Sequence, residues 1–332
     1  MNGKINLFLE NNKVLEEIKG SWGMYNVQKK CNALTFTMRD KIINIDRINL
    51  ALELIKRNTS LFSNFRGNNK LTTALAISLE DDMEGSLEEI ISIYSKLKDK
   101  FSGSEYLVIA AQIIFNSRTR VNVDNAVNNT RVAYDYMKKN HWFLTGHEDI
   151  ASAAIIATTS SNLERTFNEI EECYEYLKKN KISSSNNIQA LSNILSLINM
   201  PVKEKCDRVI DMNLVLKENK VPLKDYYIPI LGIISFLTDN NQMFAEQVAE
   251  VGRELKTHKG FGNFTLGVSL RNMISASLVS MEYLDNLDSD LKNNLIDSTN
   301  NVALTVVIAM QTAIIAASSA AAASAAASSS SS

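Results

Sequence analysis

Apolar positions recur along the chain with the spacing of an amphipathic helix, and one stripe returns about every forty residues. Within residues 87–100, apolar side chains stand at i, i+3, i+7 and i+10, which places them on one face of an α-helix. The five stripes are Leu87, Ile90, Tyr94 and Leu97; Val127, Thr130, Tyr134 and Met137; Phe167, Ile170, Tyr174 and Leu177; Cys206, Val209, Asn213 and Leu216; and Ala245, Val248, Gly252 and Leu255. This recurrence predicts a helical repeat protein.

A shorter and nearly unbroken apolar segment precedes each amphipathic one. These segments are Leu71–Leu79, Tyr106–Phe115, Ile150–Ala157, Ile188–Ile198 and Ile228–Leu237. A helix that is apolar all round is buried on all sides, so each apolar helix and the amphipathic helix after it are predicted to form an αα-hairpin. Stacked hairpins bury a continuous core, which predicts an all-α repeat superhelix of about six units, similar to HEAT, armadillo and TPR solenoids.

The repeats divide the chain into regions of one continuous domain. We expect a divergent N-terminal helical unit over 1–70, five repeats of about forty residues over 71–261, closing helices over 262–315, and an Ala/Ser low-complexity tail over 316–332. In the first region, helices are predicted near Ile5–Lys19 and Ile43–Arg57.

Four Ser/Thr-x-x-Glu sequences stand near the predicted helix starts. A hydroxyl followed three residues later by Glu forms a capping box, in which both side chains pair with backbone groups of the first turn. The predicted boxes are Ser86/Glu89, Ser102/Glu105, Thr145/Glu148 and Ser161/Glu164.

Composition narrows the class of protein. The 332 residues include only 12 Gly and 3 Pro, too few for the frequent turns of an all-β fold. A net charge of −2 argues against a nucleic-acid partner, since such domains are usually basic. The three cysteines lie far apart without a CxxC pair, which favours reduced thiols and a cytoplasmic location over a disulfide framework or a zinc site.

The C-terminal sequence allows two interpretations. Residues 298–332 carry no charge, which is compatible with a membrane tail anchor. However, the strongly apolar residues span only 302–315, whereas a spanning helix needs about 20. We therefore expect a final packing helix followed by a frayed tail, and no membrane partner.

The densest polar segment runs from His141 to Asp149. His141, His147, Glu148 and Asp149 offer imidazole and carboxylate groups for a metal or for acid–base chemistry, but His-x5-His is not a helix-face ligand spacing. The alternative is a structural turn in which Trp142, Phe143 and Leu144 fill the groove between hairpins. We favour the turn, and assign no catalytic, cofactor-binding or metal-binding residue.

A lysine follows the last stripe residue of every amphipathic segment. These lysines are Lys98, Lys138, Lys178, Lys217 and Lys256. Cations at helix C-termini offset the helix dipole, which explains them without a ligand. The alternative is a ridge of ammonium groups that binds an anionic partner.

Four short segments resemble a bacterial protein family. Phe62–Asn68, Ser104–Leu107, His141–Thr145 and Asn187–Leu197 are similar to a family catalogued as domain of unknown function four thousand and three, found mainly in low-GC Gram-positive bacteria. The resemblance extends over about 50–315 and implies a cytosolic bacterial protein. The family turn reads His-Pro-Phe-Leu-Thr, and Trp142 stands here in place of the proline. No activity follows from this resemblance.

Three functions are compatible with these patterns. Stacked hairpins without a reaction motif favour a scaffold or adaptor that binds other proteins. The first alternative is an enzyme built as a helical toroid, with its site at the turns between repeats. The second is an adaptor anchored by its C-terminal tail. These patterns specify neither a partner nor an oligomeric state.

Overall fold

The computed structural model describes residues 2–18, 25–67, 69–196 and 198–285, and every regular element in them is helical. The helices are α1 Asn2–Glu16, α2 Tyr25–Met38, α3 Ile45–Asn58, α4 Asn69–Ser78, α5 Met83–Lys98, α6 Glu105–Ser117, α7 Val123–Asn140, α8 Asp149–Thr159, α9 Leu163–Lys179, α10 Ser185–Leu195, α11 Val202–Glu218, the 3-10 helix η1 Asp225–Ile230, α12 Leu231–Ile234, α13 Asn241–Thr257 and α14 Val268–Asp285. The all-α class is confirmed, and the repeat superhelix stays a prediction. The closing helices beyond 285, the apolar stretch 302–315 and the tail 316–332 lie outside the described residues.

The helices form two compact units. The described part of unit A contains residues 12–18, 25–32, 42–67 and 69–163, and that of unit B contains residues 2–11, 33–41, 164–196 and 198–285. The division falls inside α1 and α2 and after the first residue of α9, so α1 and α2 contribute to both units and α9 lies almost wholly in unit B. The single continuous domain stays a prediction.

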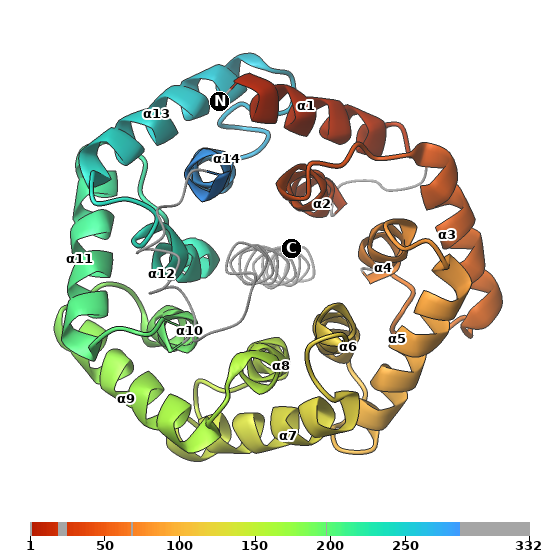
Figure 1. The fold of residues 1–332 in the computed structure, drawn as a ribbon. Coiled ribbons are helices and arrows are strands. Elements are labelled where there is room, and N and C mark those ends of the chain that lie inside the picture. The colour runs from red at the N-terminus through yellow and green to blue at the C-terminus, as the bar shows by residue number, and fades with distance from the viewer. Residues whose placement is uncertain (1, 19–24, 68, 197, 286–332) are drawn as a thin grey trace, which may run out of the picture. The chain divides into compact units, whose positions relative to one another are not determined.

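Unit A alternates amphipathic and apolar helices. Each of α3, α5 and α7 packs against the apolar helix that follows it, α4, α6 and α8 respectively. Figure 1 shows α3, α5 and α7 from the side and α4, α6 and α8 end-on, so the two kinds of helix cross steeply. The apolar helices also pack on one another, α4 on α6 and α6 on α8.

The starts of neighbouring apolar helices lie side by side in unit A. The amide of Asn69, at the start of α4, donates to the carbonyl of Glu105, at the start of α6, at 2.9 Å. Midway along the same helices, the amide of Gln112 donates to the hydroxyl of Thr73 at 2.8 Å. The helices therefore run in the same direction, and the turns that lead into them share one edge of the unit. The α7–α8 turn lies at the same edge, because Tyr134 packs on Phe101 of the α5–α6 turn and is close enough to Asp149, the first residue of α8, to interact with its charge. We call residues 59–67, 99–104 and 141–148 the turn edge.

The five predicted stripes are confirmed as buried faces. All their positions are buried except Tyr94 and Tyr134, which are half-buried. Both tyrosines instead pack against an aromatic residue of the turn that leads into the preceding apolar helix, Tyr94 on Phe65 at 5.1 Å and Tyr134 on Phe101 at 5.4 Å between ring centroids. These two tyrosines thus join α5 to the α3–α4 turn and α7 to the α5–α6 turn.

A fully buried lysine joins three elements of unit B. The Nζ of Lys205, on α11, donates to the Glu169 carboxylate of α9 at 3.0 Å. It also donates to the carbonyls of Leu195 at 2.9 Å and Ile198 at 3.2 Å, at and just beyond the C-terminus of α10. The Lys205 side chain is 0% exposed, so the ammonium replaces its hydration shell with these three oxygens.

Two elements differ from the sequence expectation. Helix α2 was not predicted: only two helices were expected in the N-terminal region. Its sequence has no capping signal and only a weak amphipathic pattern, so nothing in it indicated a helix. The predicted helix Ile228–Leu237 is instead η1 followed by the single turn α12. Pro229 lacks the amide hydrogen that a regular α-helix needs at that point.

The predicted capping boxes are wrong. Helix α5 begins earlier, and the Asp82 side chain accepts from the amide of Gly85 at 2.9 Å, so Ser86 lies inside the helix. Helix α6 starts after Ser104 rather than Ser102, and α9 starts at Leu163, after Asn162 rather than Ser161. The Thr145 hydroxyl donates to the carbonyl of His141 instead of capping α8. At α5 a neighbouring carboxylate takes the amide in place of the predicted hydroxyl, and at α6 and α8 the N-cap side chain makes no capping hydrogen bond. The Ser/Thr-x-x-Glu spacing does not indicate which of these outcomes occurs.

The side-chain amide of Asn193, on α10, is buried, and neither Oδ1 nor Nδ2 has a hydrogen-bond partner among the residues that the structure describes. Replacing Asn193 with leucine is expected to raise the free energy of unfolding by about 1–3 kcal/mol, because a side chain of similar size removes the unsatisfied polar atoms. Urea denaturation of the two proteins measures the change. Destabilisation by Asn193→Leu would contradict the expectation, and Asn199→Leu, outside the helix, serves as the comparison.

Candidate functional site

The α7–α8 turn of unit A is held by a dense set of hydrogen bonds. The backbone amides of Leu144 and Thr145 both donate to the carbonyl of His141 at 2.9 Å. The Nζ of Lys138, in the last turn of α7, donates to the carbonyls of Trp142 at 3.0 Å and Thr145 at 2.6 Å. The turn is therefore ordered by its own backbone and by one ammonium group.

This ordered turn exposes two aromatic side chains. Trp142 is 59% exposed and Phe143 is 79% exposed, and their ring centroids lie 3.4 Å apart. The prediction that these two residues fill the groove between hairpins is wrong. The hydrogen bonds to the carbonyls of His141 and Trp142 turn the chain so that both rings project outward.

Asp149, the first residue of α8, ionises abnormally. Burial raises the pKa of its carboxyl group to about 7, although the amide of Gly146 donates to Oδ2 at 2.9 Å and lowers the pKa in part. The neighbouring charge of Glu148 raises the pKa further, and the ammonium of Lys138 lowers it. A carboxyl group with this pKa changes charge near neutral pH.

The imidazoles do not join Asp149 in one polar cluster. His141 ends α7 as its C-cap, and His147 is exposed in the turn. In the part of the chain that the structure describes, no group of three His, Cys, Asp or Glu side chains is arranged to hold a metal ion. The segment His141–Asp149 is thus a shaped turn with one unusual carboxyl group.

A second turn of the same edge also exposes apolar side chains. In the α3–α4 turn, Leu61 is 74% exposed and Phe62 is 96% exposed. The turn between them in sequence differs, because Phe101 is buried against Tyr134 and Arg131 donates to the carbonyl of Lys100 at 2.6 Å. Two exposed apolar pairs therefore flank a turn whose aromatic ring packs inward.

The five lysines all lie in the last turns of amphipathic helices and are exposed. Lys98 and Lys138 belong to unit A, and Lys178, Lys217 and Lys256 belong to unit B. Lys138 donates to turn carbonyls, and Lys178 lies 3.8 Å from the Glu175 carboxylate. At Lys138 the ammonium therefore binds carbonyls of the turn beyond the helix end, not those of the last helical turn, and the dipole interpretation stays a prediction. The anionic-partner ridge stays a prediction.

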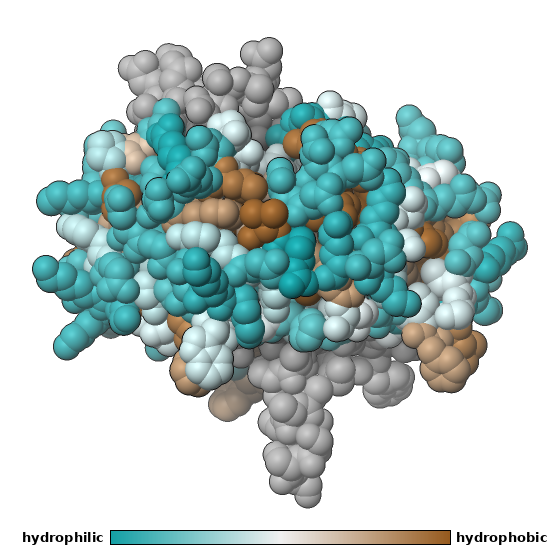
Figure 2. Space-filling model, turned by 90° about the horizontal axis from the view of Figure 1, so that it is seen from below, coloured by the Kyte–Doolittle hydropathy of each residue, from teal (hydrophilic) through white to brown (hydrophobic). Residues whose placement is uncertain are grey.

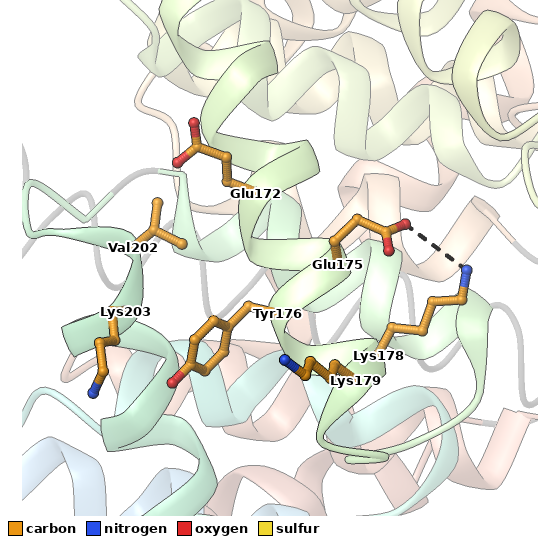
Figure 3. A pocket seen from close by; sticks show the side chains of 7 residues that line it. All are labelled: Glu172, Glu175, Tyr176, Lys178, Lys179, Val202 and Lys203. Atoms are coloured by element: carbon orange, nitrogen blue, oxygen red, sulfur yellow. Dashed lines mark ion pairs between the residues drawn. The ribbon is translucent and has the colours of Figure 1, made fainter.

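A shallow groove of about 790 Å³ lies between α9 and α11 in unit B. Figure 3 shows its lining, with the Tyr176 ring between the side chains of Lys203 and Lys179. The remaining lining residues are Glu172, Glu175, Lys178 and Val202. Lys178 and Glu175 form the ion pair that is dashed in Figure 3.

A hydrogen-bonded trio orders one side of this groove. The Tyr176 hydroxyl donates to Oδ1 of Asp207 at 2.7 Å, and Nζ of Lys203 donates to Oδ2 at 2.6 Å. These two bonds lower the pKa of Asp207, and the bond to Asp207 raises the pKa of Tyr176. The i, i+4 spacing of Lys203 and Asp207 is visible in the sequence, but the approach of Tyr176 from another helix is not.

Comparison with known proteins finds a similar protein and a matching family. It is similar to the Uncharacterized protein YeaA of Bacillus subtilis (strain 168), with 25% identity over 265 residues that cover 77% of this chain and 76% of the relative. No solved structure matches the chain. Among the described helices, none combines the length and the apolar character needed to cross a membrane. Residues 12–313 match the family described as Protein of unknown function (DUF4003), so the resemblance is confirmed and the chain belongs to that family.

Proposed function

We propose that this protein is an αα-hairpin repeat scaffold that binds a protein partner through the α9–α11 groove. The observation that carries the proposal is the groove itself, which is open, preformed and lined by side chains from two successive amphipathic helices. Repeat proteins commonly bind partners on surfaces that successive repeats build together.

The chemistry of the lining favours a polar partner segment with an apolar anchor. Tyr176 offers a ring whose orientation is set by its bond to Asp207, so little side-chain entropy is lost on binding. Tyrosine is also enriched among residues that dominate binding energy. The lysines and glutamates around it provide charges of both signs for orientation.

The test is site-specific cross-linking followed by reconstitution. A photoreactive residue at position 172, in the groove lining, introduced into the protein in its native host, should capture one predominant protein while leaving Tyr176 in place. With that protein purified, Lys178→Glu/Lys179→Glu is expected to weaken binding by about tenfold or more, measured by isothermal titration calorimetry.

The matched control is Lys217→Glu/Lys256→Glu. These substitutions make the same charge change at the ends of α11 and α13, outside the groove lining. Unchanged partner binding by this control supports the groove as the binding site. Equal weakening by both pairs would instead support binding along the ridge of five lysines. Normal binding by Lys178→Glu/Lys179→Glu would refute the groove as the binding site.

A further inference from the structure

We propose that the turn edge of unit A binds an anionic lipid surface, inserting Leu61, Phe62, Trp142 and Phe143 between the headgroups. This goes beyond the groove of unit B, which plays no part in it. The inference differs from a tail anchor, because binding at the interface needs no helix that crosses the bilayer.

The apolar side chains are suited to insertion. Phe62 and Phe143 project from two turns of one edge, each beside a second exposed apolar or aromatic residue. The surface in Figure 2 is mostly hydrophilic, with hydrophobic side chains in the middle of the view and others projecting at its lower edge. Trp142 adds an indole, whose apolar ring and polar N–H favour the boundary between hydrocarbon and water.

The charge of the edge complements anionic lipid. In the last turns of α3, α5 and α7 and in the three turns that follow, the exposed cations are Lys56, Arg57, Lys96, Lys98, Lys100, Lys138 and Lys139. The exposed carboxylates of the same stretches are Asp99 and Glu148. Glu53 and Asp124, which pair with Lys56 and Lys96, reduce this excess of positive charge without reversing it.

The geometry favours a lipid surface over a protein partner. The two apolar pairs stand on separate turns, with the buried ring of Phe101 on the turn between them. A protein would need two pockets at matching spacing, whereas a bilayer interface admits projecting side chains at any spacing. Apolar insertion combined with a basic surface is also the pair of weak signals that together give stable peripheral binding.

Trp142 permits a direct test in the full-length chain. The chain has two tryptophans, so Trp22→Phe leaves Trp142 as the only one. Vesicles of phosphatidylcholine alone are compared with vesicles that also contain phosphatidylglycerol. We expect co-sedimentation with the second kind only, a shift of Trp142 emission to shorter wavelength, and release when salt rises from about 0.1 M to about 0.5 M.

Two double variants distinguish insertion of the turn-edge side chains from nonspecific hydrophobic adsorption to vesicles. Phe62→Ser/Phe143→Ser is expected to weaken partitioning to anionic vesicles by about tenfold or more, because both rings are buried on binding. The control is Leu50→Ser/Val132→Ser, which removes exposed apolar side chains from α3 and α7 but not from the turn edge. This control should bind as the parent does. Circular dichroism tests whether each variant is folded. If Trp22→Phe does not fold, the emission of Trp142 is obtained instead as the difference between the parent and Trp142→Phe.

Three outcomes would overturn the inference. The first is absence of binding to anionic vesicles, and the second is binding that Phe62→Ser/Phe143→Ser leaves unchanged. The third is that the parent binds no vesicles but captures a protein partner that Phe62→Ser/Phe143→Ser no longer captures. None of these outcomes affects the proposal for the α9–α11 groove, which is tested separately by Lys178→Glu/Lys179→Glu.

Discussion

Replacing Lys205 with methionine is expected to lower the free energy of unfolding by about 3–5 kcal/mol. The ammonium of Lys205 donates to Glu169, Leu195 and Ile198 from a side chain that is 0% exposed. Methionine fills a similar volume but leaves the Glu169 carboxylate, itself only 18% exposed, without its cation. It also removes a positive charge from the C-terminus of α10, where the helix dipole favours one. Urea denaturation followed by circular dichroism measures the loss.

Lys203→Met provides the control. Lys203 lies two residues away on the same helix and pairs with Asp207 at 2.6 Å, but its side chain is 78% exposed. An exposed pair of this kind contributes about 0–1 kcal/mol, so this variant should be nearly as stable as the parent. Equal effects of the two substitutions would contradict the role assigned to Lys205. The double variant Lys205→Met/Glu169→Leu should recover part of the loss, since it removes the stranded carboxylate as well.

Replacing Asp149 with asparagine is expected to stabilise the protein at pH 8 by about 1–3 kcal/mol and to have little effect at pH 4. Burial raises the pKa of Asp149 to about 7, above the usual value of 3.8. The folded protein therefore retains a proton that the unfolded chain releases. The stability due to this proton is complete below about pH 4 and is lost as the pH rises through about 7.

Asparagine cannot ionise, and its side-chain oxygen still accepts from the amide of Gly146. Denaturation curves at intervals from pH 4 to pH 8 test the expectation, and Asp99→Asn, at an exposed turn position, controls for the loss of one carboxyl group. A difference between Asp149→Asn and the parent that is the same at every pH would refute the assigned ionisation. The charged groups around Asp149 are Glu148 and Lys138, and both remain in the variant.

The helices could be predicted wherever burial left a periodic trace in the sequence. The stripe that begins at Leu87 recurs because each amphipathic helix buries one face, and a 3.6-residue turn makes that face visible as spacing. Helix α2 escaped prediction because its amphipathic pattern is weak and it has no capping signal. The helix expected at Ile228 is interrupted at Pro229, whose missing amide hydrogen outweighs the apolar character of its neighbours.

The candidate sites were only partly predictable. The segment His141–Asp149 stands out by its residue types, but nothing in it indicates that Trp142 and Phe143 face solvent while Asp149 is desolvated. The Tyr176–Asp207 bond joins two residues that lie 31 positions apart on different helices, and such a contact leaves no local pattern.

By itself, then, the sequence determined the helical class, the forty-residue period and the faces that are buried, because these depend on local spacing and on the removal of apolar surface from water. Only the tertiary structure decided whether a side chain caps a given helix, which lysine is buried, and which aromatic rings stay exposed. These outcomes depend on which groups from distant parts of the chain meet, since the same ammonium or ring is stabilised or left in solvent by its neighbours in space.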